Sequence, residues 1–224
     1  MVPKLHQISR RTGVLGLAVA TWMLTLTAMA SLAGAQTCAP PSQPGPALDV
    51  PPAQLPASLA CAGDLASREP VLLVPGTTLT PQEFAWSYEP ALRARGVPYC
   101  AVTLPNHAMS DTQVSAEYVV YAIRQMHAAR RGQINIIGHS QGGMLPRWAL
   151  RFWPDTRPMV DDLVGLAPSN HGTPDAAPVC NTGMGCAPSI FQQSSEANFI
   201  KALNSHQETF PIRTSPPSPR WRAT

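Results

Sequence analysis

Short apolar runs, each bounded by polar residues, glycine or proline, recur along the chain. Runs of four to six residues rich in valine, leucine and isoleucine are typical of buried strands, because helices need longer stretches. Four such runs predict strands, at residues 71–74 (VLLV), 99–104 (YCAVTL), 134–137 (INII) and 163–167 (LVGLA).

Between the second and third runs, the apolar positions change to helical spacing. Ser110 and Gln113 have the spacing of a capping box, in which each side chain bonds the other residue's backbone N–H and so begins a helix. The apolar residues that follow fall on one stripe of this helix: Val114, Tyr118, Val119, Ala122, Ile123 and Met126. Because strands alternate with helices, the pattern predicts an α/β fold with a parallel sheet.

The first 35 residues have the pattern of an export signal. Lys4, Arg10 and Arg11 precede 23 uncharged, mostly apolar residues that end in a small-residue cleavage site at 33–35. The paired arginines suit twin-arginine export as well as the general route. An uncleaved membrane anchor is the alternative, because a run of this length can span a bilayer. Cleavage after Ala35 predicts a secreted protein, extracellular or periplasmic.

Residues 36–58 carry seven prolines and predict an extended arm rather than a separate domain, with the main domain over residues 59–210. Removing the three positive charges of the export signal brings the formal net charge from +3 to zero. A neutral domain whose basic residues are scattered gives nucleic acid no electrostatic attraction. A nucleic-acid partner is therefore not expected.

Five cysteines in an exported chain predict disulfides rather than a metal site, because no pair has zinc-ligand spacing and no histidine pair complements one. Cys61 precedes the first predicted strand and Cys100 lies in the second, so a bond between them would clamp the start of the fold. Cys180 and Cys186 enclose NTGMG, whose glycines allow the tight turn of a local bridge. Cys38 is left unassigned.

The third predicted strand runs directly into Gly-His-Ser-Gln-Gly (138–142) and then into a helical stretch. This context predicts a nucleophile elbow, a sharp strand-to-helix turn. Gly138 and Gly142 leave room for strand and helix to meet, and the turn holds Ser140 out as a nucleophile with His139 beside it. The alternative is a serine in an ordinary glycine-rich turn.

A second segment fits the same chemistry. The first predicted strand continues into Gly76 and Thr77, where an enzyme with such an elbow places half of its oxyanion hole. Thr77 can donate its backbone N–H and its hydroxyl, and Gln141 can donate the N–H that follows the nucleophile. The alternative for Thr77 is a hydroxyl that satisfies a turn. This chemistry needs no cofactor and no metal.

These motifs resemble the secreted triacylglycerol lipases of the Candida antarctica lipase B type. The resemblance covers about residues 47–210. Its most specific parts are LLVPGT (72–77), DTQVSAEY (111–118) and SQGG (140–143), with APSIFQQ (187–193) further along. It implies an α/β-hydrolase fold, in which a mostly parallel sheet is flanked by helices.

The resemblance also implies roles for single residues. Ser140 is the implied nucleophile, Thr77 and Gln141 are the implied oxyanion-hole residues, and Cys61 with Cys100 is an implied disulfide. His139 departs from the lipase B pattern, although other lipases carry histidine at this position. That departure leaves the mechanism intact.

The resemblance fails where the catalytic acid and base are expected. Both follow the nucleophile in this fold, but the histidines after Ser140 are His171 and His206. His171 directly follows the fourth predicted strand and is interpreted as a loop residue, and His206 lacks the acid and the strand expected before it. The alternative is that one of these two histidines is the base. Residues 211–224 hold four prolines, three arginines and no acid, and they share nothing with the family. We therefore expect a truncation or frameshift, a fold that is incomplete on its C-terminal side, and an aberrant or disordered tail.

The function that follows is a serine ester hydrolase, a lipase or carboxylesterase that forms an acyl-enzyme on acylglycerols or other carboxylic esters. Its expected partner is a lipid or ester substrate, met in part at a lipid–water interface, and the sequence assigns no oligomeric state. One alternative is a related acyltransferase. Another is a non-catalytic protein of the same fold that binds an acyl ligand or a partner.

Overall fold

The computed structural model describes residues 39–181 and 186–210. The predicted export signal at 1–35, Cys38 and the predicted aberrant tail at 211–224 lie outside these residues. Among the helices of the described part, none combines the length and the apolar character that a membrane crossing needs.

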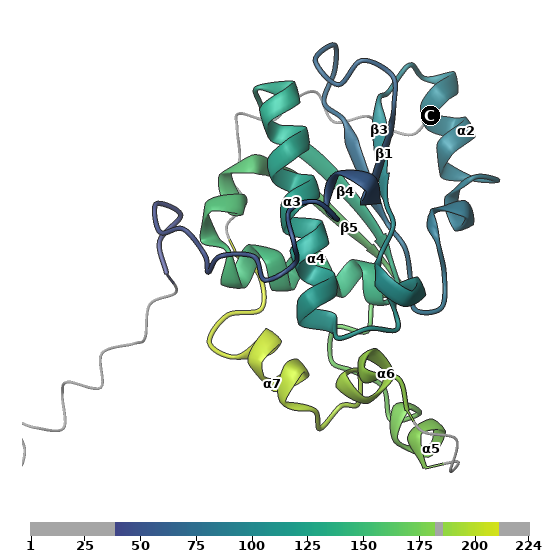
Figure 1. Ribbon diagram of the computed structural model, residues 1–224, viewed down its shortest axis with the longest axis vertical. Helices are drawn as coiled ribbons and strands as arrows, with labels where there is room; N and C mark the ends of the chain where they lie inside the picture. The colour runs from purple at the N-terminus through teal and green to yellow at the C-terminus, as the bar shows by residue number, and fades with distance from the viewer. Residues whose placement is uncertain (1–38, 182–185, 211–224) are drawn as a thin grey trace, which may run out of the picture. The chain divides into compact units, whose positions relative to one another are not determined.

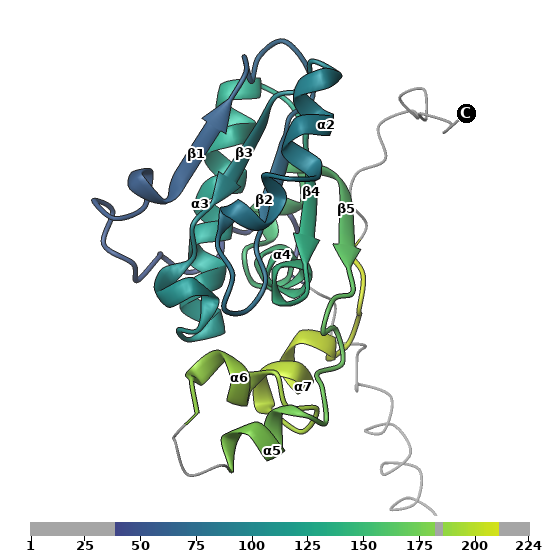
Figure 2. The same ribbon diagram turned by 90° about the vertical axis from the view of Figure 1, so that its right-hand side faces the viewer.

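Five strands of the described residues form one sheet (Figure 1), and Figure 2 shows their order, β1-β3-β2-β4-β5. Their bounds are β1 Leu59–Ala62, β2 Val71–Val74, β3 Tyr99–Val102, β4 Ile134–His139 and β5 Val160–Leu166. Strand β2 pairs in parallel with β3 and β4, and β4 pairs in parallel with β5. Strand β1 is antiparallel to β3, so the sheet is mostly parallel, with one antiparallel edge that the apolar pattern did not predict.

All four predicted strands are present, and the first has the predicted ends, Val71 and Val74, whereas the other three differ. The second ends at Val102 rather than at residue 104, although the Thr103 N–H still donates to the carbonyl of Ser58, the residue before β1, at 2.7 Å. The third extends through His139, and the fourth begins earlier, at Val160. A disulfide joins Cys61 to Cys100, which are directly opposite each other on β1 and β3.

The two faces of the sheet bury two separate apolar clusters, because successive side chains of a strand point to opposite faces. Helices α3 (Thr112–Arg130) and α4 (Gln141–Phe152) pack on the face that carries Leu72 and Val74 (Figures 1 and 2). The opposite face, with Val71 and Leu73, is covered by the segment that contains Phe84 and α2 (Tyr88–Ala94). Short 3-10 helices, η1 (Pro56–Ser58), η2 (Pro81–Phe84), η3 (Pro105–Ala108) and η4 (Pro154–Met159), connect these elements.

Helix α3 begins one residue later than the predicted capping box requires. Asp111 is its N-cap, and the carboxylate accepts the Gln113 N–H at 2.7 Å. Ser110 is therefore not the cap: Asp111 has the extended backbone of an N-cap and a charged acceptor. The predicted apolar stripe is buried except for Val114, which is 37% exposed in the first turn, where no earlier turn covers it.

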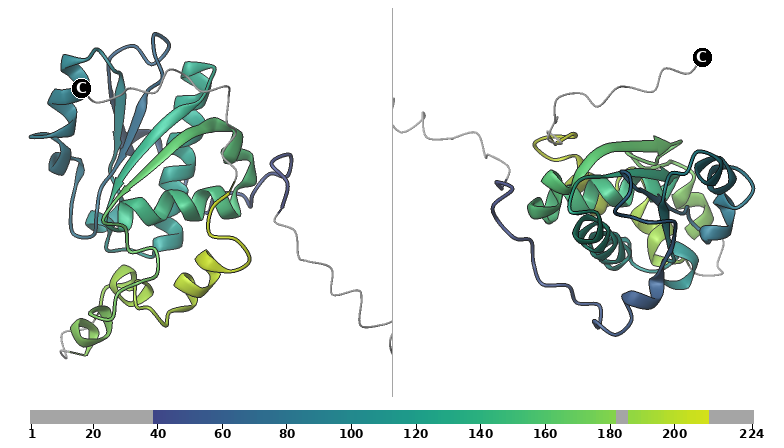
Figure 3. Two further views of the ribbon diagram at one scale, coloured as in Figure 1. Left: turned by 180° about the vertical axis from the view of Figure 1, so that it is seen from behind. Right: turned by 90° about the horizontal axis from the view of Figure 1, so that it is seen from above.

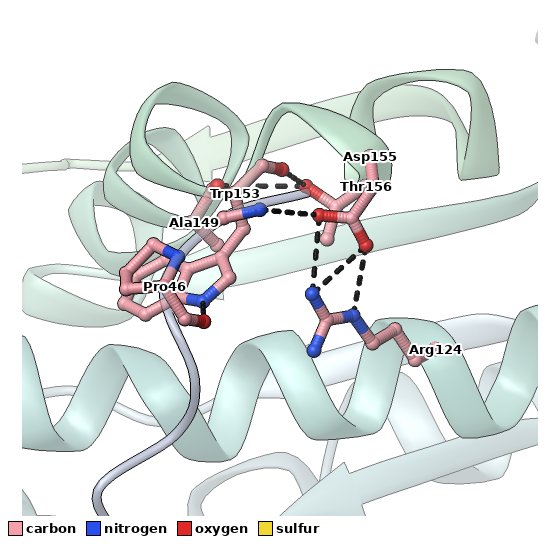
Figure 4. Close-up of polar contacts among 7 residues, drawn as sticks. Pro46, Arg124, Ala149, Trp153, Asp155 and Thr156 are labelled. Carbon is pink, nitrogen blue, oxygen red and sulfur yellow. Dashed lines mark hydrogen bonds and ion pairs between the residues drawn. The ribbon is translucent and has the colours of Figure 1, made fainter. Parts of the chain in front are cut away.

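Residues 39–55 contain no strand and pack against α3 and α4, the helices on the face of the sheet that carries Leu72 and Val74. The Trp153 indole N–H donates to the Pro46 carbonyl at 2.8 Å, next to the ion pair between Arg124 and Asp155 (Figure 4). Further along, the Val50 N–H donates to the buried Glu117 carboxylate at 2.8 Å, and the Val50 side chain is 5% exposed. This proline-rich segment therefore contributes side chains to the core.

Three short helices follow β5: α5 (Ala176–Cys180), α6 (Pro188–Gln192) and α7 (Asn198–Asn204). They lie beyond the carboxyl ends of β4 and β5 (Figures 2 and 3). The Gln192 amide oxygen accepts the backbone N–H and the hydroxyl of Thr112, which fixes α6 at the start of α3. A second disulfide joins Cys180 to Cys186. Helix α6 is thus held at the same end of the sheet as the turn after β4.

Candidate active site

Ser140 occupies the turn between β4 and α4 with a backbone that serine rarely adopts, φ 51° and ψ −122°. Two backbone hydrogen bonds hold it there. Its N–H donates to the Leu166 carbonyl at 2.8 Å, and its carbonyl accepts the Gly143 N–H at 3.0 Å. The strained turn is thus fixed to β5 on one side and to the start of α4 on the other.

The glycines of this turn are required by close backbone contacts. A Cβ on Gly138 would lie 2.0 Å from the Gly142 carbonyl oxygen, and a Cβ on Gly142 would lie 2.1 Å from the Val74 carbonyl oxygen. Only residues without a side chain allow β4, α4 and the end of β2 to approach this closely. The same approach brings the segment after β2 to Ser140, since a Cβ on Gly76 would lie 3.2 Å from the Ser140 Cβ.

Thr77 and Gln141, the two predicted oxyanion-hole residues, are in direct contact. The Thr77 hydroxyl donates to the Gln141 amide oxygen at 2.6 Å, and the Gln141 side chain is fully buried. Because Gln141 is the first residue of α4, its backbone N–H has no acceptor within the helix. The helix N-terminus also favours negative charge at this point. The arrangement therefore suits a developing oxyanion next to Ser140.

Gln193, directly after α6, completes this polar network and was not singled out from the sequence. Its amide N–H group donates to the Thr77 hydroxyl oxygen at 2.9 Å and approaches the Gln141 amide oxygen at 3.4 Å. Gln193 is 6% exposed, so these bonds are made away from solvent. The available signal was the segment APSIFQQ, which belongs to the family resemblance but carries no recognisable catalytic motif.

A second residue that the sequence did not single out is Glu83, on η2. One carboxylate oxygen lies 2.9 Å from His139 Nδ1, and the other accepts the Gly76 N–H at 3.0 Å. Burial raises the pKa of the Glu83 carboxyl, although the hydrogen bonds from His139 and Gly76 oppose this shift. His139, predicted only as a neighbour of the nucleophile, is therefore paired with a partly buried carboxylate.

The described residues bring no histidine to Ser140. Within 39–181 and 186–210, no hydrogen bond joins the Ser140 hydroxyl to an imidazole. His171 lies 3.6 Å from Glu208, and both side chains are mostly exposed. His206 is also exposed, with a left-handed backbone of φ 63°. The structure thus brings the predicted nucleophile and the predicted oxyanion-hole residues together, and the described residues offer no acid–base pair beside them.

No group of three or more His, Cys, Asp or Glu side chains in the described part of the chain is arranged to hold a metal ion. A cavity of about 310 Å³ lies between α4, β5 and the segment Glu208–Phe210. Its lining includes Gly143 and Arg147 but none of Ser140, Thr77 or Gln141. The candidate site is therefore defined by the turn and its polar network.

Known proteins share this architecture. The profile of the alpha/beta hydrolase family matches residues 71–224. Lipase B of Pseudozyma antarctica is 36% identical over 169 residues, which cover 74% of this chain and 49% of that protein. The chain thus spans about half the length of this curated relative.

Solved structures agree with the sequence comparisons. Aspergillus fumigatus lipase B superposes with a TM-score of 0.65 at 29% identity, over 73% of this chain and 41% of that one. A Bacillus licheniformis lipase in its mature form superposes with a TM-score of 0.56 at 17% identity, over 69% of this chain and 67% of that one. The second likeness concerns the fold alone.

Proposed function

The chain belongs to the α/β-hydrolase family, and from this premise we propose that it carries the nucleophile and oxyanion hole of a secreted lipase or carboxylesterase. The observation that carries the proposal is Ser140 on a strained strand-to-helix turn, with Thr77 and Gln141 in contact beside it. This combination serves nucleophilic attack on a carbonyl and stabilisation of the resulting oxyanion.

In the proposed reaction, the Ser140 oxygen attacks the ester carbonyl and its proton passes to a base. The carbonyl oxygen becomes an oxyanion that accepts the backbone N–H groups of Thr77 and Gln141. Collapse of this intermediate expels the alcohol, which takes up the proton, and leaves an acyl-enzyme. Water then releases the carboxylic acid and restores Ser140.

A lipid or other apolar ester is the proposed substrate. The similar proteins from Pseudozyma antarctica, at 36% identity, and Aspergillus fumigatus, at 29% identity, are both named lipase B, which supports a lipid substrate. Phe191 on α6 is 63% exposed although it lies two residues before Gln193, which contacts Thr77. Trp86, after η2, is 82% exposed. Large exposed apolar side chains near a polar site fit contact with acyl chains or a lipid surface.

The test is ester hydrolysis by this chain fused to the portion of the Pseudozyma antarctica relative that it does not span. The fusion should hydrolyse p-nitrophenyl esters, and Ser140→Ala should reduce turnover on the order of 10⁴-fold or more. Ser87→Ala is a matched control, because Ser87 makes no side-chain capping bond at the start of α2. Equal turnover in Ser140→Ala and Ser87→Ala would contradict the nucleophile assignment.

A second candidate function is binding of an acyl ligand without turnover. It is favoured because no hydrogen bond joins the Ser140 hydroxyl to a histidine within the described residues. In that case the 224-residue chain should bind a non-hydrolysable ester analogue, and fluorophosphonate probes, which need an activated serine, should not label Ser140. Labelling of Ser140 in the 224-residue chain would instead assign one of its own histidines as the base.

A further inference from the structure

One partly buried carboxylate, that of Glu83, connects the two halves of the candidate active site. Glu83 binds the Gly76 N–H through one oxygen at 3.0 Å and His139 through the other at 2.9 Å. Gly76 directly precedes the oxyanion residue Thr77, and His139 directly precedes Ser140. The Glu83 side chain therefore links the oxyanion loop, Gly76–Thr77, to the nucleophile turn, His139–Ser140.

The two segments also meet directly, through the hydrogen bond from the Thr77 hydroxyl to the Gln141 amide oxygen at 2.6 Å and through close packing at Gly76. The Thr77–Gln141 bond holds a side chain, whereas Glu83 binds the backbone N–H that precedes Thr77. A Cβ on Gly76 would lie 3.1 Å from His139 Nδ1 and 3.2 Å from the Ser140 Cβ, so the segments already touch. The Glu83 side chain is only 12% exposed, which shields its interactions from solvent. A hydrogen bond to a shielded carboxylate is stronger than a bond between neutral groups.

We propose that Glu83 and His139 are positioning residues, which hold the Gly76–Thr77 loop in register with Ser140 so that the Thr77 N–H points at the oxyanion. This proposal rests on the proposed function, because it assigns a role in the same reaction. Neither residue touches the reacting atoms. They act through the backbone, since rotating the peptide before Thr77 would turn its N–H away from the substrate.

The expected effect is large because oxyanion donors act only when they are placed in advance. Removing one such donor typically lowers turnover about 10²–10³-fold. Glu83→Ala leaves the Thr77 N–H in place but lets the Gly76–Thr77 loop move, so part of the oxyanion stabilisation remains. The variant should therefore lower kcat about tenfold to 10²-fold with little change in KM. Glu83→Gln keeps an oxygen for the Gly76 N–H and should restore most of the activity.

The decisive measurement is hydrogen exchange of the Gly76 amide by NMR in the 224-residue chain, which needs no turnover. Glu83→Ala should speed this exchange about tenfold or more, and Glu83→Gln should stay within about threefold of the wild type. His139→Phe removes the second contact of the carboxylate and should also speed exchange. Glu89→Ala is the control, because Glu89 is a partly buried carboxylate that binds Arg93 and Tyr99 instead.

Each result decides between roles. If Glu83→Ala leaves the exchange rate of the Gly76 amide unchanged, or changes it no more than Glu89→Ala does, Glu83 does not hold the Gly76–Thr77 loop. If His139→Phe has no effect, Glu83 acts without His139 and the coupling to the nucleophile turn is refuted. In the fusion used for Ser140, a rise in KM at constant kcat would also overturn the proposal. If Ser140→Ala does not lower ester turnover in the fusion, the proposed function is refuted. The exchange of the Gly76 amide would still show whether Glu83 holds the loop.

Discussion

At the scale of single residues, the turn around Ser140 requires glycine at two positions, 138 and 142, because a Cβ has no room there. Gly138 and Gly142 face backbone oxygens at distances no real Cβ tolerates, 2.0 Å and 2.1 Å. Backbone cannot move aside as the end of a flexible side chain can. The strained conformation of Ser140 is therefore imposed by β2, β4 and α4 together, and it is retained because those three elements are packed in the core.

Adding a methyl group at Gly138 should consequently destabilise the protein. We expect Gly138→Ala to lower the free energy of unfolding by about 3 kcal/mol or to prevent folding, because the chain must separate β4 from α4. Gly132→Ala is the matched control: its Cβ would meet only the Arg130 side chain, at 3.6 Å. That variant should be neutral or more stable by about 0.5 kcal/mol. Equal urea midpoints for the two variants would contradict this account.

Glu83 gives a pH dependence of stability with the opposite sign to that of most carboxylates. Its pKa is raised mainly by burial, so the folded state holds the proton more tightly than the unfolded state. Its contribution to stability is therefore full below the ordinary pKa and is lost as the pH rises through the raised value. Glu83→Gln cannot ionise, so the Tm of the variant minus that of the wild type should increase between about pH 4 and pH 8. A difference that is constant or falls would refute the prediction.

At the scale of elements, the antiparallel edge strand β1 is held by both hydrogen bonds and a covalent bond. Cys61 and Cys100 face each other across β1 and β3, and their disulfide closes a loop with a sequence separation of 39. Residues of β1 are partly exposed, so apolar burial contributes little to holding this strand. The disulfide is therefore expected to be its main attachment.

Loss of that disulfide should cost about 4 kcal/mol in the chain-entropy model. The double variant Cys61→Ala, Cys100→Ala should lower the urea midpoint accordingly, and the wild type should lose stability on reduction. The Cys180→Ala, Cys186→Ala variant is the control, because its loop has a sequence separation of only 6. If reduction destabilises the first variant as much as the wild type, the Cys61–Cys100 bond is not responsible. Peptide mapping of unreduced protein should recover Cys61 linked to Cys100.

At the scale of the whole molecule, the proline-rich segment before β1 belongs to the same packed unit as the sheet. Val50 and Leu55 are buried in the cluster that contains α3 and α4, and Gly45 lies against Trp153, where a Cβ would come within 2.2 Å of the indole. These contacts join residues far apart in the chain. Removing this segment would therefore uncover part of the main core.

Two valine truncations test this arrangement. Val50→Ala removes buried methyl groups and should cost about 1–3 kcal/mol. Val114→Ala removes the same atoms from a side chain that is 37% exposed, on a helix, and should stay within about 0.5 kcal/mol of the wild type. The comparison is made by urea unfolding. A larger loss for Val114 than for Val50 would show that residues 39–55 do not pack on the core in solution.

Strands β2 to β5, helix α3 and the turn at Ser140 could be predicted from the sequence. Each is encoded locally: VLLV and INII are continuous apolar runs, the α3 stripe has helical period, and glycines flank Ser140 at fixed positions. The start of α3 was misjudged by one residue because Ser110 and Asp111 are both good caps, and the choice depends on backbone geometry. Local patterns thus specify elements well and their ends less well.

Only the tertiary structure decided which distant side chains meet. Glu83 and His139 are 56 residues apart, and Gln193 and Thr77 are 116 apart. Each of these residues is an ordinary polar residue in its own segment. Their contacts arise because parallel strands bring their carboxyl ends to one edge of the sheet, where the loops that follow β2 and β4 meet the segment after α6. The apolar periodicity of a segment predicts which face of the helix or strand is buried, but it does not predict which other segment packs against that face.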